Sequence, residues 1–371
     1  MKTIYPQVQH GIVNRAQNTI FSYQGWPTVA RDEKGVLYAV ASGFRTEHIC
    51  PFGKTVMYIS RDEGETWTPP IVINDTYMDD RDAGILYMGN GRMLVTWFTH
   101  SATAYQNRWN QSIENGTTPV SHDAVMGMLN GYQHLPQQDR LSGSYLRISE
   151  DYGVTWSETI RLPISAPHGP TLCRDGSLIY LGVRMYGEDR EIPKDGGGVA
   201  FCRSVDGGYH WEVCSEIREP AWLPDGAWLD EPHVLELPDG RLMAAFRVEG
   251  PFTLAAAFSR DGGYTWGEVE DLGVCGSPPH LMLHSSGALI CTYARRDEVC
   301  AQCAIVSHDL GASWKMGYMI DDRSSTWDLG YPSTVELDDG SLMTVYYQKY
   351  GEDPNCSILY TRWRLQNGEE S

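Results

Sequence analysis

SRDGGYTW, at residues 259–266, is the stretch that decides the fold, because its pattern S-x-D-x-G-x-[TSH]-W occurs five times. The other copies are SRDEGETW at 60–67, SEDYGVTW at 149–156, SVDGGYHW at 204–211 and SHDLGASW at 307–314. Asp and Ser side chains bond to nearby backbone in tight turns, glycine supplies a positive φ, and tryptophan packs between strands. We therefore interpret each octapeptide as a structural turn between two strands, and not as a calcium loop.

Each octapeptide closes a longer unit, which begins with an apolar strand, turns at a glycine and continues as a second apolar strand. The six units are PTVARDEKGVLYAVAS, AGILYMGNGRMLVTWF, GPTLCRDGSLIYLGV, PHVLELPDGRLMAAF, PHLMLHSSGALICTY and PSTVELDDGSLMTVYY. Five units run on to an octapeptide, and the sixth ends in CSILYTRWRL instead. Three of the four gaps between octapeptides are roughly 50 residues, and the first is longer because the second unit carries an insert at 101–140.

Repeats of this length with four strands each predict an all-β, six-bladed β-propeller with four antiparallel strands per blade. The whole chain, 1–371, then forms one domain, with the insert at 101–140 belonging to blade two. We expect the C-terminal strands, between 331 and 364, to form a blade that also uses N-terminal residues to lock the ring.

The composition excludes several classes of partner. The net charge is −19 and no dense Lys/Arg run is present, so neither nucleic acid nor an anionic membrane is an expected partner. The first residues contain no apolar signal segment, and no apolar stretch reaches the ~18 residues that span a bilayer. We expect a cytoplasmic protein, and the sequence does not indicate an oligomeric state.

The nine cysteines are scattered and odd in number, which argues against a disulfide framework. Cys300 and Cys303 form a CxxC motif within an apparent strand, where residues three apart point to opposite faces. We therefore expect neither a metal site nor a cofactor.

Ionisable residues gather at one end of the predicted blades. The start of a first strand and the end of the second lie together, opposite the octapeptide turn. First-strand starts supply Trp26, Arg81, Asp82, His168, Glu231, His280 and Tyr331, and second-strand ends supply Arg45, Glu47, His48, Arg247, Arg295 and Arg296. Such a rim is typical of an anion- or sugar-binding mouth.

The insert at 101–140 joins the second and third strands of blade two, so we expect it to overhang the same rim. Its Tyr105, Trp109, Asn110 and His122 would suit a lid or recognition loop, and a subunit contact is the alternative.

Nearly the whole chain resembles the sialidase (neuraminidase) family, in which the octapeptides are known as Asp-boxes. The segment DEPHVLELPDGRLMAAFR is similar to the family segment that opens with the catalytic glutamate and ends with a carboxylate-binding arginine, which implies Glu231 and Arg247. The segment GYPSTVELDDGSLMTVYY is similar to the one that opens with the nucleophilic tyrosine, which implies Tyr331. A phenol with a pKa near ~10 needs a base before it can attack, and Glu231 would be that base.

The chain departs from the family pattern in the arginines that bind the substrate carboxylate. Gly25 stands where the family has an arginine before the proline of blade one. Arg247 remains, Arg295 or Arg296 could supply a second member, and Arg45 matches a further family arginine. Trp26, Arg81 and His168 are additional candidates for substrate contacts.

The chain also lacks the family's general acid at its usual position. Pro51 stands where the family has its acid aspartate, so the proton donor must come from elsewhere. Glu47, His48 and Asp82 are the candidates.

The resemblance implies an exo-acting glycoside hydrolase for a terminal acidic or modified sugar, with no cofactor and a glycan or glycoside as its partner. Two alternatives stay open. One is a hydrolase or lyase of another glycan, of the uronic acid or arabinan type, and the other is a noncatalytic glycan-binding propeller.

Overall fold

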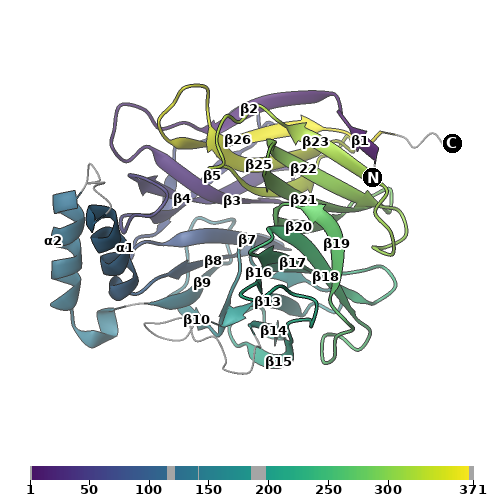
Figure 1. The fold of residues 1–371 in the computed structure, drawn as a ribbon, viewed down its shortest axis with the longest axis horizontal. Coiled ribbons are helices and arrows are strands. Elements are labelled where there is room, and N and C mark those ends of the chain that lie inside the picture. Colours follow the sequence, from purple (N-terminus) through teal and green to yellow (C-terminus); the bar gives the residue numbers. More distant parts are fainter. Residues whose placement is uncertain (1, 115–121, 141, 185–197, 367–371) are drawn as a thin grey trace.

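The computed structural model describes residues 2–114, 122–140, 142–184 and 198–366, and it confirms the six-bladed β-propeller (Figure 1). Six sheets of antiparallel strands follow one another along the chain and close into a ring.

Each blade is one hairpin-connected sheet, numbered here in chain order. Blade one contains β3 (Tyr23–Arg31), β4 (Leu37–Arg45), β5 (Lys54–Ser60) and β6 (Ile71–Asn74). Blade two contains β7 (Arg81–Gly89), β8 (Arg92–Thr99), β9 (Gly143–Ser149) and β10 (Ile160–Leu162). Blade three contains β13 (Leu178–Arg184), β14 (Val199–Ser204) and β15 (Glu212–Ile217), and two short strands, β11 (Ile164–Ser165) and β12 (Thr171–Leu172), both pair with β13.

The later blades repeat this plan. Blade four contains β16 (Trp228–Glu236), β17 (Leu242–Glu249), β18 (Thr253–Ser259) and β19 (Glu270–Cys275). Blade five contains β20 (Ser277–Leu283), β21 (Leu289–Arg296), β22 (Cys300–Ser307) and β23 (Met316–Asp321). Blade six contains β24 (Gly330–Glu336), β25 (Leu342–Lys349) and β26 (Cys356–Trp363).

The N-terminus closes the ring, as expected from the sequence. Strand β2 (Val8–Asn14) pairs antiparallel with β26 and gives blade six its fourth strand. Strand β1 (Lys2–Ile4) adds in parallel to β23, so the N-terminal segment bridges blades five and six (Figure 1).

The Asp-boxes form turns held by their own side chains. In the fourth copy, Asp261 accepts bonds from the backbone N–H of Thr265 (2.9 Å) and from its hydroxyl (2.6 Å). The buried Ser259 hydroxyl donates to Asp261 (2.8 Å) and accepts from the N–H of Gly263 (2.9 Å). The side-chain oxygens of Ser259, Asp261 and Thr265 are thereby engaged in the turn, which supports a structural role. Among the residues that the structure describes, no cluster of His, Cys, Asp or Glu is arranged to hold a metal ion.

An apolar cluster fills each interface between neighbouring blades. The one between blades six and one includes Trp26, Tyr331 and Tyr347, all buried. Burial of this surface stabilises the ring by roughly 25 cal/mol for each Å² removed from water. The aromatic bodies of two candidate site residues are therefore fixed in the seam of the ring.

The insert in blade two folds as a helical pair, α1 (Ala102–Glu114) and α2 (His122–Gln133), followed by a 3₁₀ turn at Gln137–Asp139. The helices lie at the side of the ring and not over its centre (Figure 1). Tyr105 and Trp109 are buried in a small core with Leu129 of α2, while Asn110 is exposed. Within the described part of the chain, no helix is long and apolar enough to cross a membrane.

Candidate active site

A one-residue β-bulge recurs at the start of the first strand in five blades. At each bulge the first strand advances by three residues while the second strand advances by two. In blade four, for example, Asp230 pairs with Arg247, and the next pair is His233 with Ala245. In four of these blades the residue inside the bulge has a positive φ without being glycine. These residues are Trp26 (53°), Asp82 (49°), Glu231 (40°) and Tyr331 (53°). Bulges change the direction of side chains, and each such φ costs about 1–3 kcal/mol, so these four positions carry part of the backbone strain of the molecule.

The four bulge residues line one pocket of about 300 Å³. Arg81, Arg247, Arg296 and His48 share its wall, and blade three contributes Ser165 to Pro167 and Val183. All six blades therefore meet at this pocket, and it holds most of the ionisable residues expected at the rim.

The centre of the pocket is a tyrosine–glutamate pair. The Tyr331 hydroxyl donates a hydrogen bond to Oε1 of Glu231. Burial, followed by the negative charges of Glu231 and Asp82, raises the pKa of Tyr331 well above its usual value. The phenol is therefore held neutral in the free protein, with a proton acceptor already in contact.

Arg247 fixes the other oxygen of this carboxylate. Its Nη1 donates to Oε2 of Glu231 at 2.8 Å, and its second nitrogen pairs with Glu249. Burial by itself would raise the pKa of Glu231, but the charge of Arg247 and the hydrogen bonds from Tyr331 and Arg247 outweigh it, so the pKa is lowered. Glu231 is thus an ionised base beside a neutral phenol.

Arg296, and not Arg295, completes this side of the pocket. Arg296 donates to the backbone oxygen of Leu329 (2.9 Å) and to the Tyr347 hydroxyl (3.2 Å), and its guanidinium lies 5.9 Å from the centre of the Tyr331 ring. Arg295 points to the opposite face of β21 and pairs with Asp297 at 2.6 Å. The charge of Arg296 therefore faces neutral acceptors in these bonds, which leaves it suited to an anionic group.

Arg45 does not reach the pocket. It is fully buried behind Trp26, where it pairs with Asp79 and donates to the Ser42 hydroxyl and to the backbone oxygen of His48, both at 3.0 Å. Asp79 also accepts a bond from the Tyr105 hydroxyl of the insert at 2.6 Å. The structure thus places Arg45 as a support for the pocket wall, since its acceptors are already supplied by the protein.

Arg81 lies on the pocket wall instead. Its guanidinium is 4.1 Å from the centre of the Trp26 ring, within the range of a cation–π contact. Trp26 is buried apart from what it presents to the pocket.

The three acid candidates are placed differently. Asp82 lines the pocket, and burial raises its pKa to about 7 against the opposing charge of Arg81. His48 also lines the pocket, but its Nδ1 is 2.9 Å from both Asp328 and the Tyr23 hydroxyl, and burial lowers its pKa. Glu47 is partly exposed on the same loop and is not among the residues that line the pocket.

His168 is buried outside the pocket lining, in a cluster with histidines of blades four and five. Its ring centre is 5.0 Å from that of His280 and 6.0 Å from that of His233. Nδ1 of His233 accepts the N–H of Leu281 at 3.0 Å, and burial lowers the pKa of all three imidazoles. The structure therefore makes His168 one of three neutral histidines that pack the channel, with Tyr331 on one side at 6.4 Å.

The insert residues expected to form a lid do not face the pocket. In the described ranges of the insert, none of the side chains of α1 and α2 lines it. The insert contacts the site through Tyr105 and Asp79 only indirectly, because its aromatic residues are used in its own core.

A further pattern in the sequence indicates the position of the bulge. Four of the five bulges contain a residue followed by proline, in GWPT, DEPH, SPPH and GYPS. Proline restricts the residue before it away from the right-handed helical region. The common position of Trp26, Glu231 and Tyr331 could have been recognised from this pattern.

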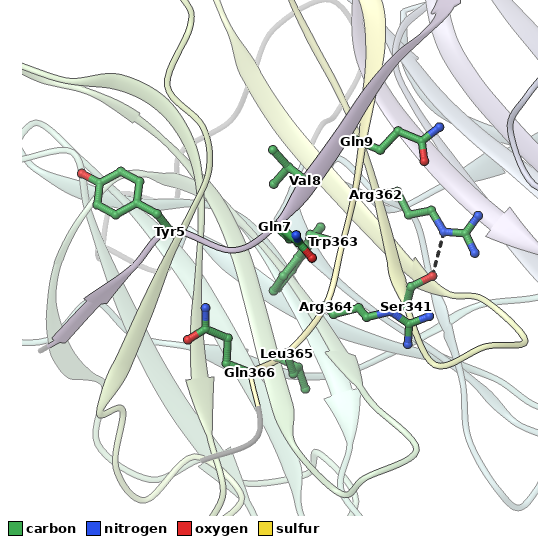
Figure 2. Close-up of a pocket in the computed structure, with 10 residues that line it drawn as sticks. All are labelled: Tyr5, Gln7, Val8, Gln9, Ser341, Arg362, Trp363, Arg364, Leu365 and Gln366. Atoms are coloured by element: carbon green, nitrogen blue, oxygen red, sulfur yellow. Dashed lines mark hydrogen bonds between the residues drawn. The ribbon is translucent and has the colours of Figure 1, made fainter. Parts of the chain in front are cut away.

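A second, larger hollow of about 660 Å³ lies where the chain ends meet (Figure 2). It is lined by residues of β2 and the segment before it, of β26 and the segment after it, and by Ser341 in the turn before β25. Within it Arg362 donates to the Ser341 hydroxyl at 2.9 Å. Its described carboxylate contacts come from outside the lining, to Gln9, Arg362 and Arg364. It offers no base beside a nucleophile, so the candidate chemistry belongs to the first pocket.

Comparison with known families and structures agrees with this architecture. The profile of the BNR repeat-like domain matches residues 79–345, and that of the BNR/Asp-box repeat matches residues 58–69. Comparison with curated protein sequences found no match.

Several solved structures share the fold at low identity. A protein of unknown function from Dyadobacter fermentans aligns with a TM-score of 0.75 and 19% identity, over 97% of this chain and 99% of that one. A variant of the NanB sialidase from Streptococcus pneumoniae aligns with a TM-score of 0.68 and 15% identity, over 95% and 70%. An α-L-arabinofuranosidase from Fusarium graminearum aligns with a TM-score of 0.58 and 12% identity, over 92% and 93%. At these identities the likeness establishes the propeller fold alone.

Proposed function

This chain belongs to the BNR repeat-like domain family, and we propose that it is an exo-acting glycoside hydrolase for a terminal acidic sugar. The observation that carries the proposal is the Tyr331–Glu231 hydrogen bond inside a pocket of about 300 Å³. This volume is at the lower end of the range for ligand sites, and it suits one terminal sugar unit better than the middle of a glycan.

The proposed reaction has two displacements. The Tyr331 oxygen attacks the anomeric carbon as its proton passes to Glu231, and the bond to the leaving oxygen breaks as Asp82 protonates it. Water then attacks the same carbon, Asp82 takes a proton from that water, and Glu231 returns its proton to the departing Tyr331 oxygen. Two displacements at one carbon retain the anomeric configuration.

The arginines support an acidic substrate. Arg247 and Arg296 lie beside the nucleophile, and guanidinium groups bind carboxylates through paired hydrogen bonds. A neutral nucleophile also avoids the repulsion that a carboxylate nucleophile would meet from an anionic sugar. With Gly25 in place of the family arginine, one charge-assisted bond is missing, which weakens binding of a sialic carboxylate about tenfold or more.

A panel of aryl glycosides tests this proposal. It should contain a sialoside, uronic acid glycosides, an arabinofuranoside and neutral hexosides, assayed with the protein and with Tyr331→Phe. We expect the highest kcat/KM for an acidic sugar, weak turnover of the sialoside, and loss of turnover in the variant. Best turnover of the arabinofuranoside would favour a function like that of the Fusarium graminearum enzyme, and saturable binding without turnover of any glycoside would indicate a glycan-binding propeller.

A further inference from the structure

Arg81 and Asp82 form a stretched ion pair on the pocket wall. Nε of Arg81 lies 3.7 Å from Oδ1 of Asp82, whereas charge-assisted hydrogen bonds are about 2.7–2.9 Å long. Each side chain is 7% exposed. Nε and Nη1 of Arg81 and Oδ1 of Asp82 are buried and have no hydrogen-bond partner among the described residues. The protein therefore holds a cation and a carboxyl group next to each other with these three atoms unsatisfied.

The surroundings of Asp82 make Arg81 the principal control on its proton. Burial raises the pKa of Asp82, Arg81 lowers it most among the neighbours, and Glu231 raises it again. The titratable and charged groups that act on Asp82 or share its pocket are Arg45 on β4, His48 on the loop after β4, Asp79 before β7, Arg81 on β7, His100 after β8, Tyr180 on β13, Asp230 and Glu231 on β16, Arg247 on β17, Arg296 on β21, Tyr331 on β24 and Tyr347 on β25. Arg45 is committed to Asp79, and Arg247 to two glutamates, so Arg81 is the cation beside Asp82 whose pairing is incomplete.

We propose that the Arg81–Asp82 pair senses the charge of the sugar, so that a carboxylate-bearing sugar in the pocket causes Asp82 to take up a proton and a neutral sugar does not. The inference rests on the proposed function, because it gives Asp82 its role as the acid. The ring of Trp26 provides a flat surface along which the guanidinium can shift toward a substrate carboxylate while keeping its cation–π contact.

Two effects act in the same direction when an acidic sugar binds. Competition for Arg81 removes part of the attraction that keeps Asp82 ionised, and the sugar's own negative charge repels the ionised form. The acid is then protonated when the leaving group needs it, and only for substrates of the right charge. Substrate charge is thus selected through protonation in addition to direct binding.

Proton uptake on ligand binding tests the inference without requiring turnover. N-Acetylneuraminate and D-galacturonate are the acidic probes, and D-galactose is the neutral control, each adjusted to pH 7.0 and added to the weakly buffered protein with a pH indicator. For a rise of one pKa unit from about 7, we expect uptake of about 0.4 proton per bound acidic sugar. Asp82→Asn should abolish the uptake. The control variant Asp297→Asn, at a carboxylate that pairs with Arg295 outside the pocket lining, should retain it.

The ligand-free protein provides a second measurement. The carboxyl carbon of Asp82, followed by ¹³C NMR during a pH titration, should report a pKa raised by at least one unit in Arg81→Gln and little changed in Arg81→Lys. An unchanged pKa in Arg81→Gln would contradict the inference.

The outcomes separate this inference from the proposed function. Saturable binding of an acidic sugar without proton uptake, uptake that persists in Asp82→Asn, or equal uptake with D-galactose overturns the charge sensor and leaves the Tyr331–Glu231 chemistry intact. Absence of turnover in the glycoside panel, with uptake as expected, overturns the hydrolase and leaves the sensor. Binding of D-galactose but of neither acidic probe overturns both.

Discussion

The hydroxyl of Tyr331 donates a hydrogen bond to the carboxylate of Glu231 across 100 residues of sequence. The two residues come from blades six and four, and each occupies the bulge at the start of its first strand. The ring therefore brings together two side chains that no local segment could position, and the ring of Tyr331 packs in the apolar seam between blades six and one.

Replacement of Tyr331, the proposed nucleophile, is the first test of this pair. Tyr331→Phe should lower kcat by at least about 10³-fold on the best glycoside of the panel, because the attacking oxygen is removed while the ring that fills the seam remains. Steady-state kinetics measures the loss, and circular dichroism and the midpoint of urea unfolding should change little.

Tyr293→Phe is the matched control. Tyr293 is a buried tyrosine on β21 that does not line the pocket, so its hydroxyl can be removed without affecting the chemistry. Equal losses in both variants would show that the effect of Tyr331→Phe comes from packing.

Asp82 should show the behaviour of a general acid. Asp82→Asn should reduce kcat/KM by about 10²–10⁴-fold for a glycoside with a poor leaving group, and much less for a nitrophenyl glycoside, whose leaving oxygen needs little protonation. In the unmodified protein kcat/KM should fall as the pH rises through about 7, because the acid must be protonated and burial holds the pKa of Asp82 there. This decrease in kcat/KM at high pH should be absent in Asp82→Asn.

The other two acid candidates provide the comparison. His48→Gln and Glu47→Gln should keep the same ratio of rates for good and poor leaving groups as the unmodified protein. A strong leaving-group dependence in His48→Gln, with none in Asp82→Asn, would transfer the acid role to His48.

The three channel histidines should make the ring sensitive to acid. Their folded-state pKa values lie below the unfolded value near 6.5, and that of His233 is about 4. Between these values the unfolded chain binds more protons, so the free energy of unfolding should fall as the pH is lowered below 6.5, by up to about 1.4 kcal/mol per pH unit for each histidine. Urea unfolding at several values between pH 7.5 and pH 5 measures this slope.

His233→Gln should reduce that slope by the contribution of one histidine, even if the variant is less stable at pH 7.5. His134→Gln, at an exposed position on the insert, should leave the slope unchanged. A slope that is the same in both variants and in the unmodified protein would show that other groups dominate the acid response.

The Asp-boxes should contribute to stability and not to chemistry. Ser259→Ala removes a buried hydroxyl that both donates to Asp261 and accepts from Gly263, so we expect a loss of about 1–2 kcal/mol in the free energy of unfolding. Activity on the best substrate should be unchanged, and added Ca²⁺ should not raise the unfolding midpoint. A stabilising effect of Ca²⁺ that is lost in the variant would instead identify the box as a calcium loop.

The fold could be predicted because the sequence contains an internal repeat for each blade. Five Asp-boxes and six strand-turn-strand units determine the number of blades, and the missing octapeptide of the last unit leaves a blade for the N-terminus to complete. The helical pair at 101–140 was not predicted, because its side chains face one another and the sequence gives no repeat against which to compare them.

The site was harder to predict at the level of single side chains. Arg295 and Arg296 are adjacent, so only the pleat of β21 decides which one faces the pocket, and a shift of one residue exchanges them. Arg45 is the last residue of β4, at the rim of the ring. Its side chain is nevertheless buried in an ion pair with Asp79 and does not line the pocket. The orientation of Asp82 depends on a bulge with a positive φ, which strand alternation does not encode.

The closure of blade six also sets an order of events during synthesis. Strand β2 cannot find its partner until β26, more than 300 residues later, has been made. At 5–20 residues per second the wait is roughly 20–70 seconds, during which β2 lacks its native partner. Strand β2 must therefore remain without this partner until nearly the whole ring has been translated, and the seam between blades six and one, which contains Trp26 and Tyr331, is among the last parts of the molecule to form.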